Sequence, residues 1–318
     1  MTHQTTNIGT NFGILGLGKM GGNMARRLAS KGISIAVFDQ DPALTASLAS
    51  EIKAVATTSL TDMVGKLAKP RVLWMMLPAG EITESTLSQL QALLDKGLLD
   101  AGDTIVDGAN SNYKDSVRRA ASTEALGLNY MDAGVSGGVH GLANGYCLMV
   151  GGNDAALSAV QPYLEALAPA ASTGWLHAGP AGAGHYTKMV HNGIEYGMMA
   201  ALAEGLSLIK AKTEFDIDLA DVTELWRHGS VVRSWLLDLT ADVLKTDQTL
   251  DSIRAHVPDS GEGRWTVNES IEQGVPTPVM TMALMSRFAS QGADDYASKL
   301  LAKMRQGFGG HAVAVAKV

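Results

Sequence analysis

Residues 12–21 read FGILGLGKMG, and this stretch decides the fold of the first half of the chain. A short apolar run leads into Gly-x-Gly-x-x-Gly, and a helical pattern follows at residues 20–31. A second apolar run, residues 33–38, ends at Asp39. A strand, a glycine turn, a helix and a second strand ending in an acid are the fingerprint of a dinucleotide-binding βαβ unit.

The glycine turn predicts a site for the pyrophosphate of a dinucleotide. Glycines let the backbone approach the phosphates, and the start of a helix offers free N–H groups and partial positive charge. The residues expected to contact the cofactor here are Gly16, Leu17, Gly18, Lys19, Met20 and Gly21. Asp39 can accept hydrogen bonds from both ribose hydroxyls and repel a 2′-phosphate, so the sequence favours NAD, with NADP weaker. Alternatively, Asp39 caps a helix that begins at Pro42.

Strand and helix patterns then alternate as far as residue 180. The expected strands are residues 53–56, 71–77, 103–107, 130–133, 146–150 and 175–178, with helices at 59–67, 82–94 and 154–167. This alternation predicts a parallel, doubly wound α/β domain of the Rossmann type over residues 1–180. Leu77-Pro78 and Asn110 follow two of the strands, where ligands sit in such sheets.

From residue 181 the β patterns disappear. Helical patterns occupy residues 183–210, 218–227, 235–244, 266–273, 278–290 and 295–304. They predict an all-α second domain over residues 181–318, and a chain of 318 residues is about twice the usual single-domain length. The polar, glycine-rich residues 255–265 are expected to form a loop long enough to have a function.

Composition excludes several classes of function. The net charge of −7 provides no broad basic surface for nucleic acid or anionic lipid. The single cysteine, Cys147, lies in an apolar run and is expected to be a small buried hydrophobe. The eight histidines form no i, i+4 pair, so no metal site is expected. Without a basic leader or a run of about 18 apolar residues, we expect a soluble, cytoplasmic protein with no membrane partner.

The first helix of the second domain carries a polar face. Its members are Lys188, His191, Asn192, Glu195 and Tyr196. At about 100° per residue these side chains lie within one broad sector, which would combine a base, an acid and an amide. An ordinary ion pair between Lys188 and Glu195 is the alternative. Gly184, Gly193 and Gly197 disfavour a helix, and their clustering indicates that something approaches it closely.

Together these motifs resemble the decarboxylating 6-phosphogluconate dehydrogenase family, within the β-hydroxyacid dehydrogenase superfamily. The matching stretches are GLGKMG (16–21), DGANS (107–111), GVSGG (134–138), GAGH (182–185), KMVHNGIEYG (188–197), and Arg305 with FGGH (308–311). They span almost the whole chain. The chain looks like the short form of the family, with a reduced helical domain.

The resemblance implies a mechanism. Lys188 would take the proton from the C3 hydroxyl while the hydride leaves C3 for the nicotinamide, and Asn192 would hold the same oxygen. After loss of CO2, Glu195 would protonate C1 of the enediol to release ribulose 5-phosphate, a step of the pentose phosphate pathway and of gluconate utilisation. Lys188 must start neutral, so desolvation is expected to lower its pKa from about 10.4.

The resemblance also assigns binding roles. Leu77, Pro78 and Asn110 would line the cofactor. The substrate's carboxylate and hydroxyls would be surrounded by Asn110, Ser136, Gly137, Gly138 and His191. Its distal phosphate would face Tyr196, Arg287, Arg305 and His311. The last two would come from a partner subunit, in a homodimer or a dimer of dimers.

One pair of residues departs from the family. Long members carry Lys and Thr where this chain has Ser260 and Glu262. A carboxylate about 4 Å from a phosphate charge costs about 4 kcal/mol at an effective dielectric near 20. Glu262 must therefore turn away, pair with Arg264 or bind a sugar hydroxyl. The departure leaves open a sulfonated or unphosphorylated sugar acid as substrate. Two further hypotheses are a dehydrogenase of the superfamily that acts on a smaller 3-hydroxy acid, and a non-catalytic nucleotide-sensing protein.

Overall fold

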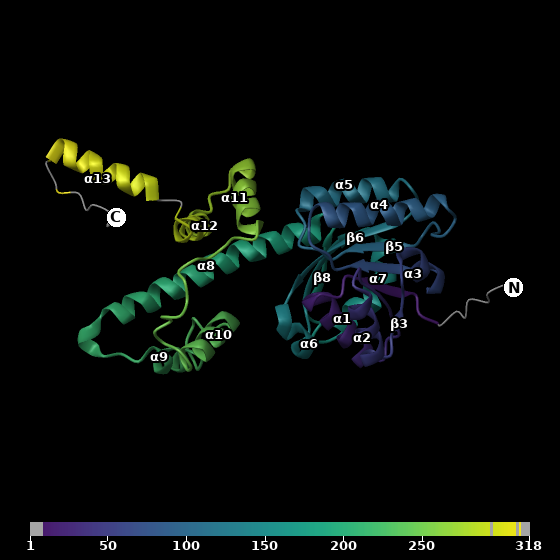
Figure 1. The fold of residues 1–318 in the computed structure, drawn as a ribbon, viewed down its shortest axis with the longest axis horizontal. Helices are drawn as coiled ribbons and strands as arrows, with labels where there is room; N and C mark the ends of the chain where they lie inside the picture. The colour runs from purple at the N-terminus through teal and green to yellow at the C-terminus, as the bar shows by residue number, and fades with distance from the viewer. Residues whose placement is uncertain (1–8, 293–294, 310–311, 313–318) are drawn as a thin grey trace. The chain divides into compact units, whose positions relative to one another are not determined.

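The computed structural model describes residues 9–292, 295–309 and 312. The chain divides into two compact units, residues 1–189 and 190–318, and the division falls inside helix α8 (Ala183–Ala211). The first unit is α/β and the described part of the second is helical, which confirms the predicted fold class (Figure 1). A domain boundary between residues 180 and 181 stays a prediction.

The first unit is built on one eight-stranded sheet with the order β3-β2-β1-β4-β5-β6-β7-β8. The strands are β1 (Phe12–Leu15), β2 (Ala36–Phe38), β3 (Val55–Ala56), β4 (Val72–Met75), β5 (Thr104–Asp107), β6 (Asn129–Ser136), β7 (Cys147–Gly152) and β8 (Trp175–Gly179). Strand order reverses between β1 and β4, which makes the crevice at their carboxyl ends the expected ligand position.

Two strands depart from the parallel sheet that the sequence predicts, because β8 is parallel to β7 and both run against the other strands. β7 runs antiparallel to β6, with Ser136 opposite Cys147. Only the short helices η1 (Gly138–His140) and α6 (Gly141–Asn144) join them, and a parallel crossover needs a dozen or more residues. Cys147, predicted to be buried, is exposed because it begins β7, and burial starts at Leu148.

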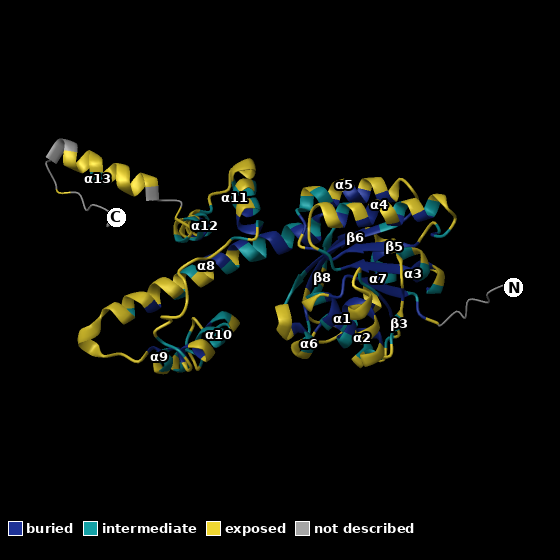
Figure 2. Ribbon diagram, viewed as in Figure 1, coloured by how far each residue is buried: buried dark blue, intermediate teal, exposed yellow. Residues whose placement is uncertain are grey.

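Helices cover both faces of the sheet, as Figure 1 shows. They are α1 (Lys19–Ser30), α2 (Pro42–Ile52), α3 (Leu60–Lys66), α4 (Glu81–Asp95), α5 (Tyr113–Glu124) and α7 (Asp154–Leu167). Side chains alternate along the strands: in β4, Trp74 packs with α1, α2 and α7, whereas Met75 packs with α3, α4 and α5. Two apolar cores result, and the buried residues of Figure 2 concentrate in this sheet.

The described part of the second unit consists of the remainder of α8 and the helices that follow it. They are η2 (Thr213–Phe215), α9 (Leu219–Trp226), α10 (Trp235–Leu244), α11 (Glu262–Gln273), α12 (Pro278–Ser290) and α13 (Asp295–Gly309). α11 begins at Glu262, so residues 262–265 are helical and the predicted loop is shorter; Gly261, with φ +106°, makes the turn into the helix. Among the described residues, no helix is both long and apolar enough to cross a membrane.

Candidate active site

The glycine turn leaves room for a ligand beside Gly18. An added Cβ at Gly16 or Gly21 would collide with a backbone carbonyl oxygen, of Met76 and of Gly16 respectively. At Gly18, a Cβ would meet nothing within 4 Å. Gly18 immediately precedes α1, and no side chain in the described part of the chain caps that helix. The first-turn N–H groups of α1 therefore lie beside open space, which fits a bound pyrophosphate.

Asp39 follows β2 and faces this turn. Its Oδ2 accepts a hydrogen bond from the Leu17 N–H at 2.7 Å, and its Oδ1 accepts one from the Asp41 N–H at 2.9 Å. The alternative role of Asp39 as a helix cap is wrong, because Asp41 caps α2 through the N–H groups of Ala43 and Leu44. A carboxylate offers about four lone-pair sites, so Asp39 can still accept from two ribose hydroxyls.

The carboxyl ends of β4 and β5 lie beside that of β1. Leu77 and Pro78 follow β4, and Asn110 follows β5 with an exposed side chain. A buried network shapes the turn that presents Asn110. It is centred on the Asp107 carboxylate, which accepts from the Ala109 N–H at 3.1 Å, Arg119 at 2.8 Å and the Tyr130 hydroxyl at 3.0 Å.

β6 runs three residues beyond the predicted strand at residues 130–133 and ends in a glycine turn. Ser136 is its last residue, and Gly137 and Gly138 follow with φ of +127° and +52°. Glycine is favoured at such positive φ angles. Earlier in β6, Gly134 lies against α8, where an added Cβ would collide with the Lys188 side chain. Lys188 is only 8% exposed, which is unusual for a lysine and is not the position of a solvated surface residue.

Beyond Lys188, α8 carries the other members of the predicted polar face. His191 Nδ1 lies 3.1 Å from Asn192 Oδ1 and 4.0 Å from a Glu195 carboxylate oxygen. The side chains of His191 and Glu195 remain 39% and 41% exposed, so both are open to a ligand. The burial of Lys188 is not that of a lysine on a solvated face, and an ion pair of Lys188 with Glu195 stays the alternative.

The glycines of α8 accommodate the protein itself. A Cβ at Gly184 would lie 2.7 Å from the Asp132 carbonyl oxygen of β6. One at Gly193 would lie 2.7 Å from the Thr266 side chain of α11, and one at Gly197 would lie 3.2 Å from Val279. What approaches α8 closely at these positions is two strands, β6 and β7, and two helices, α11 and α12.

A polar cluster in the second unit contains two of the four predicted phosphate-facing residues, Tyr196 and Arg287. The Arg287 guanidinium stacks on the Tyr196 ring at 3.4 Å and donates to the Pro258 carbonyl at 3.0 Å. The Tyr196 hydroxyl accepts from the Ser260 N–H at 3.3 Å. Tyr196 is thereby held between the loop and an arginine.

Glu262 takes an inward position in this cluster. It is 1% exposed, and its Oε2 accepts from the Ser260 hydroxyl at 2.5 Å. A pair with Arg264 does not form, because Arg264 binds Asp259 at 2.7 Å. Oε1 has no hydrogen-bond partner within the described ranges.

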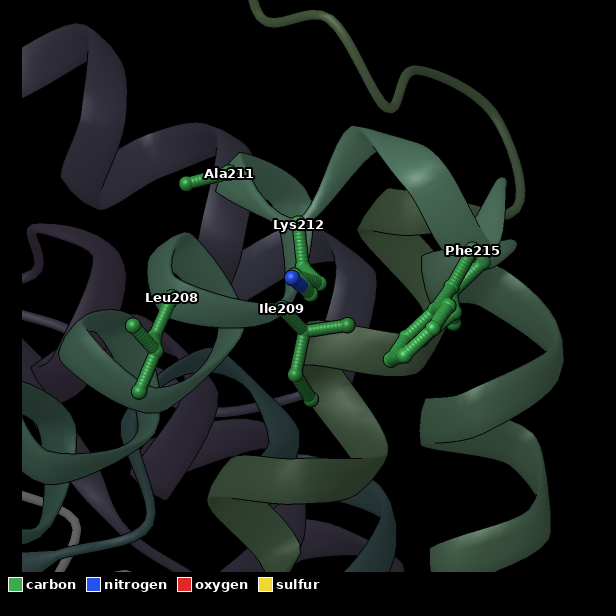
Figure 3. A pocket seen from close by; sticks show the side chains of 6 residues that line it. Leu208, Ile209, Ala211, Lys212 and Phe215 are labelled. Carbon is green, nitrogen blue, oxygen red and sulfur yellow. The ribbon is translucent and has the colours of Figure 1, made fainter.

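The two remaining predicted residues lie late in the chain. Arg305 is exposed on α13, and His311 lies outside the described residues. Elsewhere in the second unit, an open apolar hollow of about 370 Å³ lies at the end of α8 (Figure 3). It is lined by Leu208, Ile209, Ala211, Lys212, Phe215 and Ile217. Glu195 precedes Leu208 by thirteen residues, or about 20 Å of helix, so the hollow is remote from the polar face.

The buried polar residues behind these turns were not predicted from the sequence. Asp107, Arg119 and Asp132 are each at most 1% exposed. A usable signal existed, because an aspartate within an apolar strand, such as Asp132 in residues 129–136, must have partners to be buried.

Two family descriptions match most of the chain. Residues 11–176 match the NAD binding domain of 6-phosphogluconate dehydrogenase, and residues 184–314 match the C-terminal domain of the same enzyme.

Three similar proteins carry related names. A putative 6-phosphogluconate dehydrogenase of Bacillus subtilis is 41% identical, over 95% of this chain and 98% of that one. An NAD(+)-dependent, decarboxylating 6-phosphogluconate dehydrogenase of Haloferax volcanii is 39% identical over the same shares. The solved Plasmodium falciparum 6-phosphogluconate dehydrogenase has a TM-score of 0.80 at 29% identity, covering 96% of this chain and 66% of that chain.

Proposed function

Because this chain belongs to the 6-phosphogluconate dehydrogenase family, we propose that it oxidises and decarboxylates 6-phosphogluconate to ribulose 5-phosphate and CO2 with NAD. The observation that carries the proposal is the setting of Lys188. This lysine is 8% exposed against Gly134, on a helix that continues into His191, Asn192 and Glu195. A buried amine on the same helix as an acid and an amide supplies the groups that general acid–base chemistry requires.

The chain's own residues divide the chemistry. Lys188 removes the proton of the C3 hydroxyl, and Asn192 donates a hydrogen bond to that oxygen. Bound NAD supplies the acceptor for the C3 hydride. CO2 then leaves the 3-keto acid, the Lys188 ammonium stabilises the developing enolate oxygen, and Glu195 protonates C1 of the enediol. The open exposure of Glu195 suits a proton donor that exchanges with solvent.

The cofactor residues proposed are those of the glycine turn, residues 16–21, together with Asp39, Leu77, Pro78 and Asn110. The open space beside Gly18 and the uncapped start of α1 support the pyrophosphate position. Asp39 supports NAD over NADP, because its carboxylate lies next to the turn and would repel a 2′-phosphate. NADP is expected to react more weakly.

The substrate residues proposed are Asn110, Ser136, Gly137, Gly138 and His191 for the carboxylate and hydroxyls. Tyr196 and Arg287 would meet the distal phosphate, with Arg305 and His311 from a partner subunit. The stacking of Arg287 on Tyr196 supports this assignment because it preorganises a cation. Of the three outcomes expected for Glu262, a carboxylate turned into the protein is the one that its burial against Ser260 supports.

A homodimer or a dimer of dimers would complete the site. Large apolar side chains are exposed on α8, α12 and α13 of the second unit. They include Ile194, Met198, Leu208, Val279, Met282, Leu300, Leu301 and Met304. Exposed apolar surface on this scale is typical of a protein interface, and a second copy is the partner that the trans role of Arg305 requires. A cytoplasmic location stays a prediction.

The test is an assay of NAD and NADP reduction with 6-phosphogluconate, with CO2 collected. We expect NAD reduction and CO2 in equal amounts. Oxidation of a smaller 3-hydroxy acid without CO2 would favour another dehydrogenase of the superfamily. Reduction of neither cofactor by any sugar acid or hydroxy acid would favour a nucleotide-sensing protein.

A further inference from the structure

We propose that Asp132 and His185 are positioning residues, which fix the start of α8 against the sheet and thereby hold Lys188 at its working position. The proposal rests on the function proposed for Lys188. Neither residue is assigned to the cofactor or the substrate. Both are 1% exposed or less, and they belong to different elements, β6 and α8.

Asp132 anchors the first turn of α8. Its carboxylate oxygens accept hydrogen bonds from the N–H of Gly182 at 2.6 Å and from the N–H of His185 at 2.7 Å. The first N–H groups of a helix lack partners within the helix, and a negative charge there also interacts favourably with the helix dipole. Burial raises the pKa of Asp132, whereas His185 and these two N–H groups oppose the increase. A carboxylate on strand β6 therefore caps helix α8, and the capped residue His185 lies three residues before Lys188.

His185 extends the anchor to α5. Its Nδ1 lies 2.7 Å from the Ser116 hydroxyl, and that oxygen lies 3.4 Å from the Asn112 carbonyl. Asn112 caps α5, two residues after Asn110. Nε2 of His185 is buried and has no hydrogen-bond partner among the described residues. A buried ring nitrogen without a partner destabilises the folded state, and a leucine at this position would avoid that cost. The hydrogen bond to Ser116 therefore accounts for a histidine at this position.

Close backbone contacts leave the anchored helix no room to shift. A Cβ at Gly184 would lie 2.7 Å from the Asp132 carbonyl oxygen and 2.8 Å from the Gly151 nitrogen. A Cβ at Gly134 would lie 3.1 Å from the Gly184 carbonyl oxygen and would collide with Lys188. Reactions at an enzyme site tolerate misplacement of about 0.5 Å. Loss of the anchor would therefore lower kcat and leave the glycine turn at residues 16–21 unchanged.

The network joins three segments that carry proposed site residues. β6 leads from Asp132 to Ser136, α5 begins three residues after Asn110, and α8 leads from His185 to Lys188. Asp132 and His185 thus set the distance between Lys188, the proposed base, and the segments that carry Asn110 and Ser136.

The test compares Asp132→Asn with a matched control, Asp103→Asn. Asp103 is equally buried and also accepts two backbone N–H groups, from Arg71 at 2.7 Å and Asp100 at 3.0 Å, and these belong to segments other than α8. We expect Asp132→Asn to lower kcat at least tenfold while the Kd for NAD changes less than twofold. Amide hydrogen exchange in residues 182–189 should accelerate at least tenfold. Asp103→Asn should lower the unfolding temperature and leave kcat within twofold.

A second pair of variants covers the case in which Asp132→Asn does not fold. Ser116→Ala should lower kcat severalfold, and Ser116→Thr, which keeps the hydroxyl, should restore it. Unchanged kcat and unchanged exchange in Asp132→Asn and Ser116→Ala would overturn the proposal, as would equal kcat losses in Asp132→Asn and Asp103→Asn. The exchange measurement needs no substrate. Suppose that exchange is faster in Asp132→Asn but the wild-type protein does not oxidise 6-phosphogluconate. That result would refute the proposed function and leave the anchoring role of Asp132 supported.

Discussion

Cofactor choice offers the sharpest test of a single side chain. Asp39 lies at the end of β2 with Oδ2 2.7 Å from the Leu17 nitrogen, so its charge sits beside the proposed ribose position. We expect Asp39→Ser combined with Gln40→Arg to shift the ratio of kcat/KM for NAD to that for NADP by at least tenfold toward NADP, about 1.4 kcal/mol.

The magnitude follows from charge and exposure. Two charges 4 Å apart interact by about 1 kcal/mol in bulk water and by about 4 kcal/mol at an effective dielectric of 20. Gln40 is exposed and Asp39 is half-buried, so values near the lower limit apply to each change. Removing one repulsion and adding one attraction then gives about 2 kcal/mol. Loss of the bond to Leu17 weakens both cofactors and cancels in the ratio.

The assay measures both cofactors at saturating 6-phosphogluconate. Asp41→Ser is the matched control, because it removes an acid two residues away while serine still caps α2. Its ratio should change less than threefold. A wild-type enzyme that prefers NADP, or a double variant that keeps its preference for NAD, would refute the role given to Asp39.

Further predictions concern catalysis, assembly and pH. Lys188→Met should lower the rates of both oxidation and decarboxylation by about 100-fold or more, the usual contribution of a general base, in steady-state assays with unchanged NAD binding. Glu195→Gln should slow proton delivery to C1, measured by solvent tritium incorporation, while NAD binding stays within twofold. Lys188→Met and Arg305→Ala, each inactive alone, should regain activity as co-refolded hetero-oligomers; inactivity of verified hetero-oligomers would exclude a shared site. Hydrogen bonds from Arg118 lower the pKa of Glu84 to about 2, so its stabilisation should be present above pH 4.5 and lost toward pH 2. In urea unfolding, Glu84→Gln should differ from wild type at pH 7 and converge with it in acid.

The fold could be predicted because local patterns and long-range packing agree in this chain. Glycine spacing in residues 12–21, apolar strands and alternating helices each point to the same doubly wound sheet, and the helices at residues 235–244 and 278–290 have the predicted bounds. The reversal of β7 and β8 was not predicted, because the direction of β7 depends on the length of the connection from residue 137 to 146, which has no period of its own, and β8 follows β7 in parallel.

The candidate site was predictable where a motif carries the chemistry. The polar face of α8 and the turns after β1, β5 and β6 could all be read from residue spacing. The environment of Glu262 could not, because a polar residue in a glycine-rich segment gives no sign of burial. Only the folded structure shows that Arg264 pairs with Asp259, so that Glu262 accepts its hydrogen bond from Ser260 instead.

The buried aspartates explain why turns so rich in glycine can still hold a precise geometry. Glycine permits the positive φ of +95° at Gly182, but it also gives the unfolded chain more freedom to lose. Asp107 and Asp132, on neighbouring strands, each bind backbone N–H groups of the segment that follows or packs against them. Each carboxylate therefore orders a flexible segment from within the sheet. A chain that places its reactive groups on or beside glycine-rich segments needs such fixed acceptors beneath them, and the buried strands β5 and β6 supply them here.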